Sequence, residues 1–195
     1  MKPSSSTTLY TLGKGILYIS EYSDACPVAS YSDLGNCPRL DCEVTEEKLD
    51  HYSSRSGARV KDKSVILETG YTITFDLDEM SVKNLQIFLK AELAGGGNVL
   101  RANQELTKEW IVKFISDNPA GPNETWEFWR VKLSPAGSFS LISDEWSALS
   151  FSGEGLADTD CQSNSPYFNV TFCTTSTTST STTSSSTTSS STTTV

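Results

Sequence analysis

The eight residues Tyr71-Thr72-Ile73-Thr74-Phe75-Asp76-Leu77-Asp78 alternate strictly between apolar and polar side chains. Because successive side chains of a β-strand point to opposite faces, this period of two predicts a strand with one buried and one exposed face. The segment 40–45 alternates in the same way, with Leu40, Cys42 and Val44 opposite Asp41, Glu43 and Thr45. The sequence therefore predicts two strands, around residues 40–45 and 65–78, whose apolar faces meet the core.

Residues 46–63 lie between these strands and are almost wholly polar. Their charges are mixed: Glu46, Glu47, Asp50 and Asp62 stand against Lys48, Arg55, Arg59, Lys61 and Lys63. A stretch with so few apolar side chains cannot offset the entropy of ordering itself. We expect a long loop here, disordered in a lone subunit.

Elsewhere the chain reads as further strands and one helix. Strands are expected at 16–19, 109–116, 126–133, 139–142, 146–154 and 168–172. A helix is expected after an N-cap at Asp78 or Ser81, with an apolar stripe of Val82, Leu85, Phe88, Leu89 and Leu93 lying on the sheet and an end at the glycines 95–97. The pattern predicts a mainly β fold, a β-sandwich or barrel of about seven or eight strands with one flanking α-helix.

Composition divides the chain into three parts. Residues 1–11 read as an N-terminal arm, and residues 12–173 contain most of the aromatic side chains and form one expected β-sandwich domain. Residues 174–195 are all Ser or Thr except the last, which predicts a low-complexity tail without a core of its own. A neighbouring subunit capturing that tail as an extended arm is one interpretation, and a solvated fringe is the other.

The net charge of −9 argues against a nucleic-acid-binding surface, because phosphate contacts require Lys and Arg. No run of 18 apolar residues is present, so no membrane-spanning helix is expected, and the first residues lack the apolar core of a secretory signal. Without such a signal, we expect all five cysteines to be reduced, namely Cys26, Cys37, Cys42, Cys161 and Cys173.

No arrangement of residues predicts catalysis, a cofactor or a metal. The single histidine, His51, lies in the charged segment beside Asp50, where a solvated side chain is expected. A zinc site of Cys26, Cys37, Cys42 and His51 is an alternative, but Cys42 shares the apolar side of its strand, which favours a buried thiol.

Several segments, in order along residues 12–158, resemble the major tail tube proteins of siphophages, the bacteriophages with long non-contractile tails. The first is Leu34-Gly35-Asn36-Cys37-Pro38, followed by Leu49-Asp50-His51-Tyr52-Ser53-Ser54-Arg55-Ser56-Gly57 and Val60-Lys61-Asp62-Lys63. The others are Trp129-Arg130-Val131-Lys132-Leu133-Ser134-Pro135-Ala136-Gly137, then Ser143-Asp144-Glu145-Trp146, then Phe151-Ser152-Gly153-Glu154-Gly155-Leu156-Ala157-Asp158. The stretch between Cys26 and Cys37 and the Ser/Thr tail depart from the family pattern.

The resemblance implies a structural virion protein rather than an enzyme. Six copies would form a ring, and rings would stack into a tail tube that conducts the genome during ejection. The partners implied are further copies of the chain, the tape measure, terminator and distal tail proteins, and double-stranded DNA that passes without sequence-specific binding. The protein would be assembled in the host cytoplasm and reside in the virion tail.

Two sets of site residues follow from this interpretation. The charged segment suits contacts between rings, for which we expect Tyr52, Arg55, Arg59, Lys61, Asp62 and Lys63. The polar faces of the two alternating strands contain no Lys or Arg, so Asp41, Glu43, Thr72, Thr74 and Asp76 are expected to line the lumen as a weakly repelling wall. The alternative is that this face meets bulk solvent outside the tube.

Two other functions remain open from the sequence. A secreted carbohydrate-binding β-sandwich module would also combine aromatic residues with a Ser/Thr-rich segment. A tail terminator or baseplate ring protein would share the fold and differ only in what it assembles into.

Overall fold

The computed structural model describes residues 6–26, 29–55 and 57–173 of the 195-residue chain. Within them the strands are β1 (Gly15–Glu21), β2 (Ser32–Asp33), β3 (Arg39–Ser53), β4 (Val60–Leu77), β5 (Glu92–Ala94), β6 (Val99–Arg101), β7 (Trp110–Ser116), β8 (Asn123–Pro135), β9 (Leu149–Gly155) and β10 (Phe168–Cys173). One helix, α1 (Val82–Phe88), and two 3-10 turns, Thr7–Leu9 and Gly95–Gly97, complete the described elements. The predicted mainly β fold is confirmed. The structure has more strands than expected because β2, β5 and β6 are too short to show a pattern in the sequence.

All described strand pairs are antiparallel, and eight strands form one sheet. Seven of them follow the order β2-β1-β7-β8-β9-β4-β3, and β10 pairs with β8 beside this path. Strand β8 is the branch point of this sheet. One edge of β8 pairs with β7, while its other edge pairs first with β10 over Asn123–Phe128 and then with β9 over Val131–Pro135. The remaining strands, β5 and β6, form a separate hairpin beyond α1.

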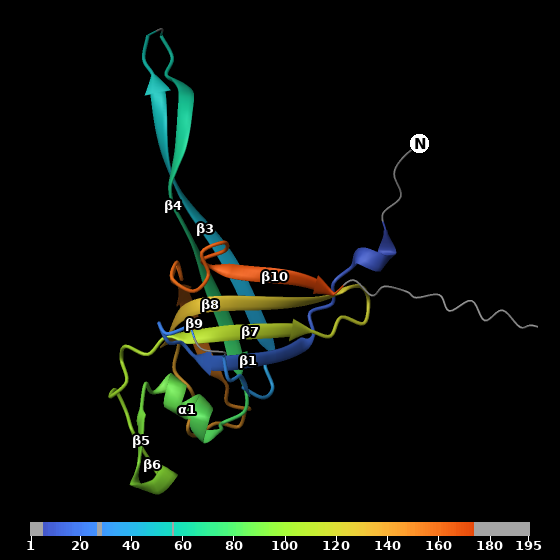
Figure 1. The fold of residues 1–195 in the computed structure, drawn as a ribbon, viewed down its shortest axis with the longest axis vertical. Coiled ribbons are helices and arrows are strands. Elements are labelled where there is room, and N and C mark those ends of the chain that lie inside the picture. Colours follow the sequence, from blue (N-terminus) through green and yellow to red (C-terminus); the bar gives the residue numbers. More distant parts are fainter. Residues whose placement is uncertain (1–5, 27–28, 56, 174–195) are drawn as a thin grey trace, which may run out of the picture.

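The sheet folds over itself at β8, so its two parts face each other. In Figure 1, β3 and β4 cross behind β10, β8, β7 and β1. The core lies between the two parts and contains Leu17 and Ile19 of β1, Tyr71, Ile73, Phe75 and Leu77 of β4, Val112 of β7, Phe128, Val131 and Leu133 of β8, and Leu149 and Phe151 of β9. The predicted burial of one face of β4 is confirmed, because its odd-numbered side chains from Tyr71 to Leu77 are buried.

Helix α1 covers one end of this core (Figure 1). The Ser81 side chain accepts a hydrogen bond from the Asn84 backbone N–H at 3.1 Å, which confirms Ser81 as the N-cap. The helix is shorter than expected: it ends at Phe88, and the chain reverses at Lys90, which has a φ of 48°. Glycines 95–97 lie at the tip of the β5–β6 hairpin and do not end the helix.

The C-terminal turn of this seven-residue helix makes the main core contact. Ile87 and Phe88 are buried, whereas the expected stripe residues Leu85 and Leu89 are half-buried against the core and Val82 is exposed. Phe88 stands edge-on to Phe151, with ring centroids 5.5 Å apart.

Truncation of these helix residues should have unequal effects. We expect Phe88→Ala to lower the free energy of unfolding by about 3–5 kcal/mol, because it leaves a cavity against Phe151. The half-buried neighbour Leu89→Ala should cost about 1–2 kcal/mol. Urea denaturation of the two variants measures the difference. Equal losses in the free energy of unfolding would contradict the deeper burial of Phe88.

Two sequence expectations are wrong at the level of secondary structure. Residues 139–142 form no strand but belong to an irregular connection between β8 and β9. Residues 46–63 are not a long loop: β3 and β4 remain paired through most of this segment, and only residues 54–59 connect them. The polar composition does not exclude strands here, because a two-stranded ladder satisfies its backbone hydrogen bonds without burying a core.

The expected burial of one face of β3 is also wrong. Leu40 packs partly against the core, but Cys42 and Val44 are exposed. Strand β3 lies at the end of the sheet, and beyond Leu40 its apolar side chains Cys42 and Val44 are not covered by the core.

Candidate assembly surfaces

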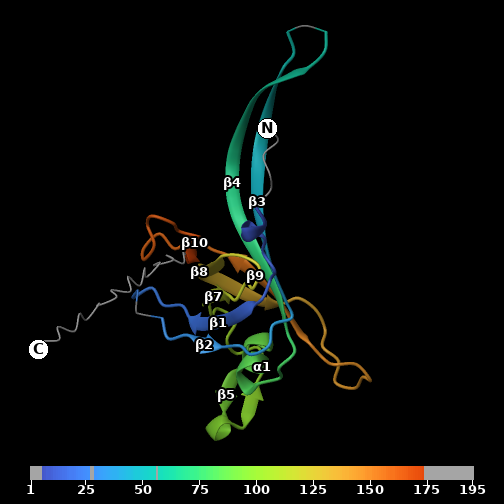
Figure 2. The same ribbon diagram turned by 90° about the vertical axis from the view of Figure 1, so that its right-hand side faces the viewer.

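The hairpin of β3 and β4 extends far beyond the body of the protein (Figures 1 and 2). We call residues 46–69 the distal hairpin. Its ladder runs from Glu46 opposite Thr69 to Ser53 opposite Val60, with register shifts that leave Leu67 and Asp62 as extra residues on β4. Such bulges increase the local twist of a two-stranded ribbon.

Charged and aromatic side chains form cross-strand pairs on the distal hairpin. Lys61 Nζ lies 2.7 Å from Asp50 Oδ1, and His51 Nδ1 lies 2.6 Å from Asp62 Oδ1. The Arg59 guanidinium carbon lies 5.1 Å from the centre of the Tyr52 ring. These pairs are exposed, so each contributes little to stability by itself.

The structure places all six expected inter-ring residues in the outer half of the distal hairpin. Tyr52 and Arg59 are brought together, Lys61 and Asp62 each pair with a residue of β3, and Lys63 lies opposite His51. Arg55 stands in the connecting turn.

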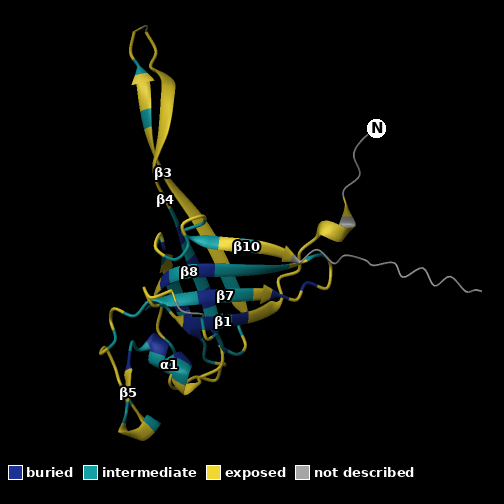
Figure 3. Ribbon diagram, viewed as in Figure 1, coloured by how far each residue is buried: buried dark blue, intermediate teal, exposed yellow. Residues whose placement is uncertain are grey.

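The distal hairpin also exposes apolar side chains that the sequence analysis did not treat as a surface. They are Leu49, Tyr52, Val60, Val65, Ile66 and Leu67, each between 41% and 61% exposed. Figure 3 shows this part of the ribbon as almost entirely exposed. The contiguous run Val65-Ile66-Leu67 is the sequence signal for this surface, because three adjacent apolar residues of a strand place apolar side chains on both of its faces.

Both outer edges of the distal hairpin are free of other described strands. Strand β3 ends the sheet and pairs only with β4, and β4 pairs with β9 only over Thr72–Leu77. Unpaired backbone groups along a strand edge are a template for another strand. The distal hairpin thus offers two pairing edges and an exposed apolar surface.

The second surface is a polar face that continues across four strands. Asp41 lies opposite Thr74 and Glu43 opposite Thr72, so these predicted lumen residues share one face. Asp76, in turn, aligns with Ser150 of β9. The sequence analysis missed the continuation of this face onto β9 and β8, where its members are Ser150, Ser152, Glu154, Ser134 and Lys132. We call the whole set, with Arg39, the polar face.

The polar face includes two basic residues where it extends beyond the two predicted segments. Arg39 lies opposite Asp76, and its Nε lies 2.7 Å from Asp41 Oδ2. Lys132 lies opposite Glu154 at the other end. Four carboxylates stand against these two cations, so the polar face keeps a net negative charge. Arg39 was overlooked because it precedes the residues that alternate cleanly.

A disulfide joins two loops on the body. Cys26 and Cys161 are bonded, with their Cα atoms 5.5 Å apart, which overturns the expectation of five reduced cysteines. The fold brings together two residues 135 positions apart, and sequence spacing could not show this. Cys26 is therefore not available as a zinc ligand. Cys37 and Cys42 are free, and burial raises the pKa of the Cys37 thiol to about 11.

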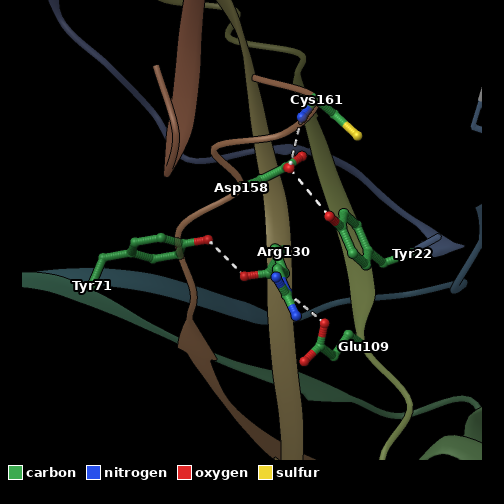
Figure 4. A network of polar contacts seen from close by, with 6 residues as sticks. All are labelled: Tyr22, Tyr71, Glu109, Arg130, Asp158 and Cys161. Atoms are coloured by element: carbon green, nitrogen blue, oxygen red, sulfur yellow. Dashed lines mark hydrogen bonds and ion pairs between the residues drawn. The ribbon is translucent and has the colours of Figure 1, made fainter. Parts of the chain in front are cut away.

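Polar contacts reinforce the same region (Figure 4). Buried Asp158 accepts hydrogen bonds from the Tyr22 hydroxyl at 3.1 Å and from the Cys161 backbone N–H at 3.1 Å. Arg130 pairs with Glu109, and its carbonyl accepts a hydrogen bond from the Tyr71 hydroxyl. Burial and the bond to Asp158 raise the pKa of Tyr22 to about 12, so its phenol remains a donor at neutral pH. This network holds the loops and is not a catalytic arrangement of nucleophile and base.

Removal of the disulfide should destabilise the body. We expect Cys26→Ser combined with Cys161→Ser to lower the free energy of unfolding by about 2–4 kcal/mol, because the bond closes a long loop in the unfolded chain. Urea denaturation with and without reductant measures this cost. Cys42→Ser, at an exposed free thiol, is the control and should change stability by less than about 0.5 kcal/mol. A reductant-insensitive midpoint would contradict the bond.

Within the described residues, no helix is both long and apolar enough to cross a membrane.

Solved structures that match the chain include components of contractile injection systems. One is from the six-fold symmetrised baseplate of the anti-feeding prophage, with 10% identity, a TM-score of 0.44, and coverage of 88% of this chain and 97% of that chain. Another is from the tube-terminating cap of the same particle, with 8% identity, a TM-score of 0.37, and coverage of 87% and 96%. A third is from the extended sheath–tube complex of PVC, an extracellular contractile injection system, with 10% identity, a TM-score of 0.35, and coverage of 80% and 88%.

Sequence comparison gives the family. No curated protein matches the chain significantly. One family model matches residues 10–109 and 94–171, which together span the body, the distal hairpin and all ten strands except the last residues of β10. The chain therefore belongs to the family described as protein of unknown function UCP028589.

Proposed function

We propose that this chain is a structural subunit of a phage-like tail, which assembles with further copies of itself into stacked rings. The observation that carries the proposal is the distal hairpin. An isolated two-stranded hairpin is marginally stable in water, and this one exposes six large apolar side chains and two free strand edges. A surface of this kind is completed when another subunit covers it.

The distal hairpin suits contacts between rings because it reaches beyond the body in one direction (Figure 2). The residues that would contact the adjacent ring are Tyr52, Arg55, Arg59, Lys61, Asp62 and Lys63. Their pairs within the hairpin are exposed, so opposite charges of a neighbouring copy can exchange with them. Repetition around a ring would turn weak single pairs into a fixed register.

The polar face suits the lumen of such a tube. It is continuous over β8, β9, β4 and β3, it carries Ser and Thr at its centre, and its net charge is negative. In a ring of six, every carboxylate of this face would be repeated sixfold. DNA would meet a hydroxyl-rich wall with a weak, even repulsion rather than a series of cationic traps.

The finer assignment follows the resemblance to siphophage tail tube proteins. On this proposal the chain is a tail tube subunit in the virion tail, assembled in the host cytoplasm, and it is not an enzyme. Its rings contact the tape measure protein inside the tube and the terminator and distal tail proteins at the two ends. Double-stranded DNA passes through transiently, without sequence-specific binding.

Electron microscopy of the purified chain tests this function. Long uniform tubes are the expected result. Isolated rings that never stack would instead indicate a terminator or baseplate ring protein, and monomers at all concentrations would refute self-assembly. Binding to insoluble polysaccharide, without assembly, would favour a carbohydrate-binding module.

A further inference from the structure

The connection between β8 and β9 presents three apolar side chains to solvent. Leu141, Ile142 and Trp146 are 85%, 97% and 99% exposed. We call residues 140–147 the apolar loop, which Figure 2 shows in orange, projecting from the body away from β1. The Ser147 hydroxyl donates to the Ser140 carbonyl at 2.7 Å and closes the base of the loop. Aromatic side chains bury roughly 150–250 Å² each when they dock, so a fully exposed tryptophan on a closed loop indicates a contact surface.

A groove with complementary walls lies elsewhere on the same chain. It has a volume of about 630 Å³ and runs between α1, β5 and the β1–β7 pair, and we call it the α1 groove. Its apolar lining includes Val82 and Leu93, which are 52% and 43% exposed, together with Trp110 and Ile111. The groove can hold a large apolar side chain and is not filled by the chain's own apolar loop, whose side chains lie free in solvent.

Charge distinguishes the two surfaces and gives them opposite signs. Lys83 lines the α1 groove and has no carboxylate partner within 4.0 Å among the described residues, while burial lowers its pKa. Lys108 lines the groove as well and is paired with Glu105 and Glu21. The apolar loop carries Asp144 and Glu145, neither of which forms an ion pair within the described part of the chain. Because Glu21 also lines the groove and pairs with Lys108, Lys83 is the one unpaired lysine of the described lining. An acidic loop with apolar tips thus matches a groove that has apolar walls and this unpaired cation.

We propose that the apolar loop of one copy docks into the α1 groove of a second copy, with Trp146 and Ile142 between Val82 and Leu93 and with Asp144 or Glu145 beside Lys83. The donor and acceptor surfaces differ, so the contact is head-to-tail, and it either closes a ring or continues as a filament. The inference rests on the proposed self-assembly but concerns a surface separate from the distal hairpin and the polar face.

Variants at positions outside the hydrophobic core test the contact. The loop variant carries Ile142→Ser and Trp146→Ser, and the groove variant carries Lys83→Glu and Leu93→Ser. Each variant alone should retain the wild-type unfolding midpoint and need at least a tenfold higher concentration to assemble, measured by sedimentation velocity. Phe172→Ser, at another exposed aromatic, and Lys14→Glu, at an exposed lysine outside the groove, are the controls and should assemble like the wild type.

Two further measurements establish that the two surfaces meet each other. An equimolar mixture of loop variant and groove variant retains one intact loop and one intact groove, so it should contain dimers that neither variant forms alone. Lys83→Glu combined with Asp144→Lys and Glu145→Lys should recover assembly that Lys83→Glu loses.

The outcomes separate this inference from the proposed function. Loop and groove variants that assemble at wild-type concentration overturn the docking and leave the tube proposal intact. Wild-type rings that require the loop but never stack support the docking and overturn the tube. A wild-type chain that stays monomeric at every concentration overturns both.

Discussion

Shortening the distal hairpin is expected to abolish tubes while leaving the body folded. Residues 49–65 can be replaced by Asn-Gly, because Lys48 and Ile66 are directly opposite on the two strands and a two-residue turn of this type closes an antiparallel pair. The removed side chains make no contribution to the described core. The unfolding midpoint should therefore remain close to that of the wild type, while electron microscopy should show rings or monomers in place of tubes.

The matched control removes only the connecting turn. Replacing residues 54–59 by Asn-Gly keeps the ladder up to Ser53 and Val60 and retains Tyr52 and the exposed apolar side chains. This variant should still form tubes, with weaker stacking from the loss of Arg55 and Arg59. If the variant that lacks residues 49–65 forms normal tubes, the hairpin does not contribute to the interface between rings.

Reversing charge on the polar face should have its effect on the passage of DNA rather than on assembly. Glu43→Lys with Asp76→Lys changes the charge by four per copy and leaves Arg39 beside new cations. Each phosphate that a lysine neutralises releases counterions, so the lumen would hold DNA. In particles carrying both substitutions, genome ejection should slow by at least roughly tenfold at low salt and recover as salt rises.

The control for this prediction moves the same charge to another surface. Asp117→Lys with Asp160→Lys changes the net charge equally at exposed positions outside the polar face. Ejection from these particles should keep the wild-type rate at all salt concentrations. If the two pairs of substitutions behave alike, the polar face is on the outside of the tube.

The sequence predicted the fold class, most strand positions and the N-cap because these depend on local patterns. The alternation of residues 71–78 and the cap at Ser81 are set by neighbours along the chain. The burial of β3 failed because it depends on which strand covers which, and the position of β3 at the sheet end is a property of the whole topology.

The candidate surfaces were predictable to a smaller extent. The mixed charge of residues 46–63 predicts a contact surface, but composition does not indicate that two polar strands can pair with each other as a ladder. The disulfide between Cys26 and Cys161 and the exposure of Trp146 both arise from the folding of distant loops. The tail from Thr174 to Val195, with its two interpretations, lies outside the described residues, so truncation after Cys173 remains a test of sequence-based expectation.

Strand β4 connects the tip of the distal hairpin mechanically to the core. It is continuous from Val60 at the tip to Leu77 in the core, so a pull on the tip is transmitted along the strand axis into the body. There the load falls on the pairing of Thr72–Leu77 with β9, whose hydrogen bonds run across the strands and are loaded together in shear. In the proposed tail, bending under drag would stretch the subunits along this direction. Failure would then require the whole β4–β9 ladder to slip at once, while the two-stranded tip remains free to flex.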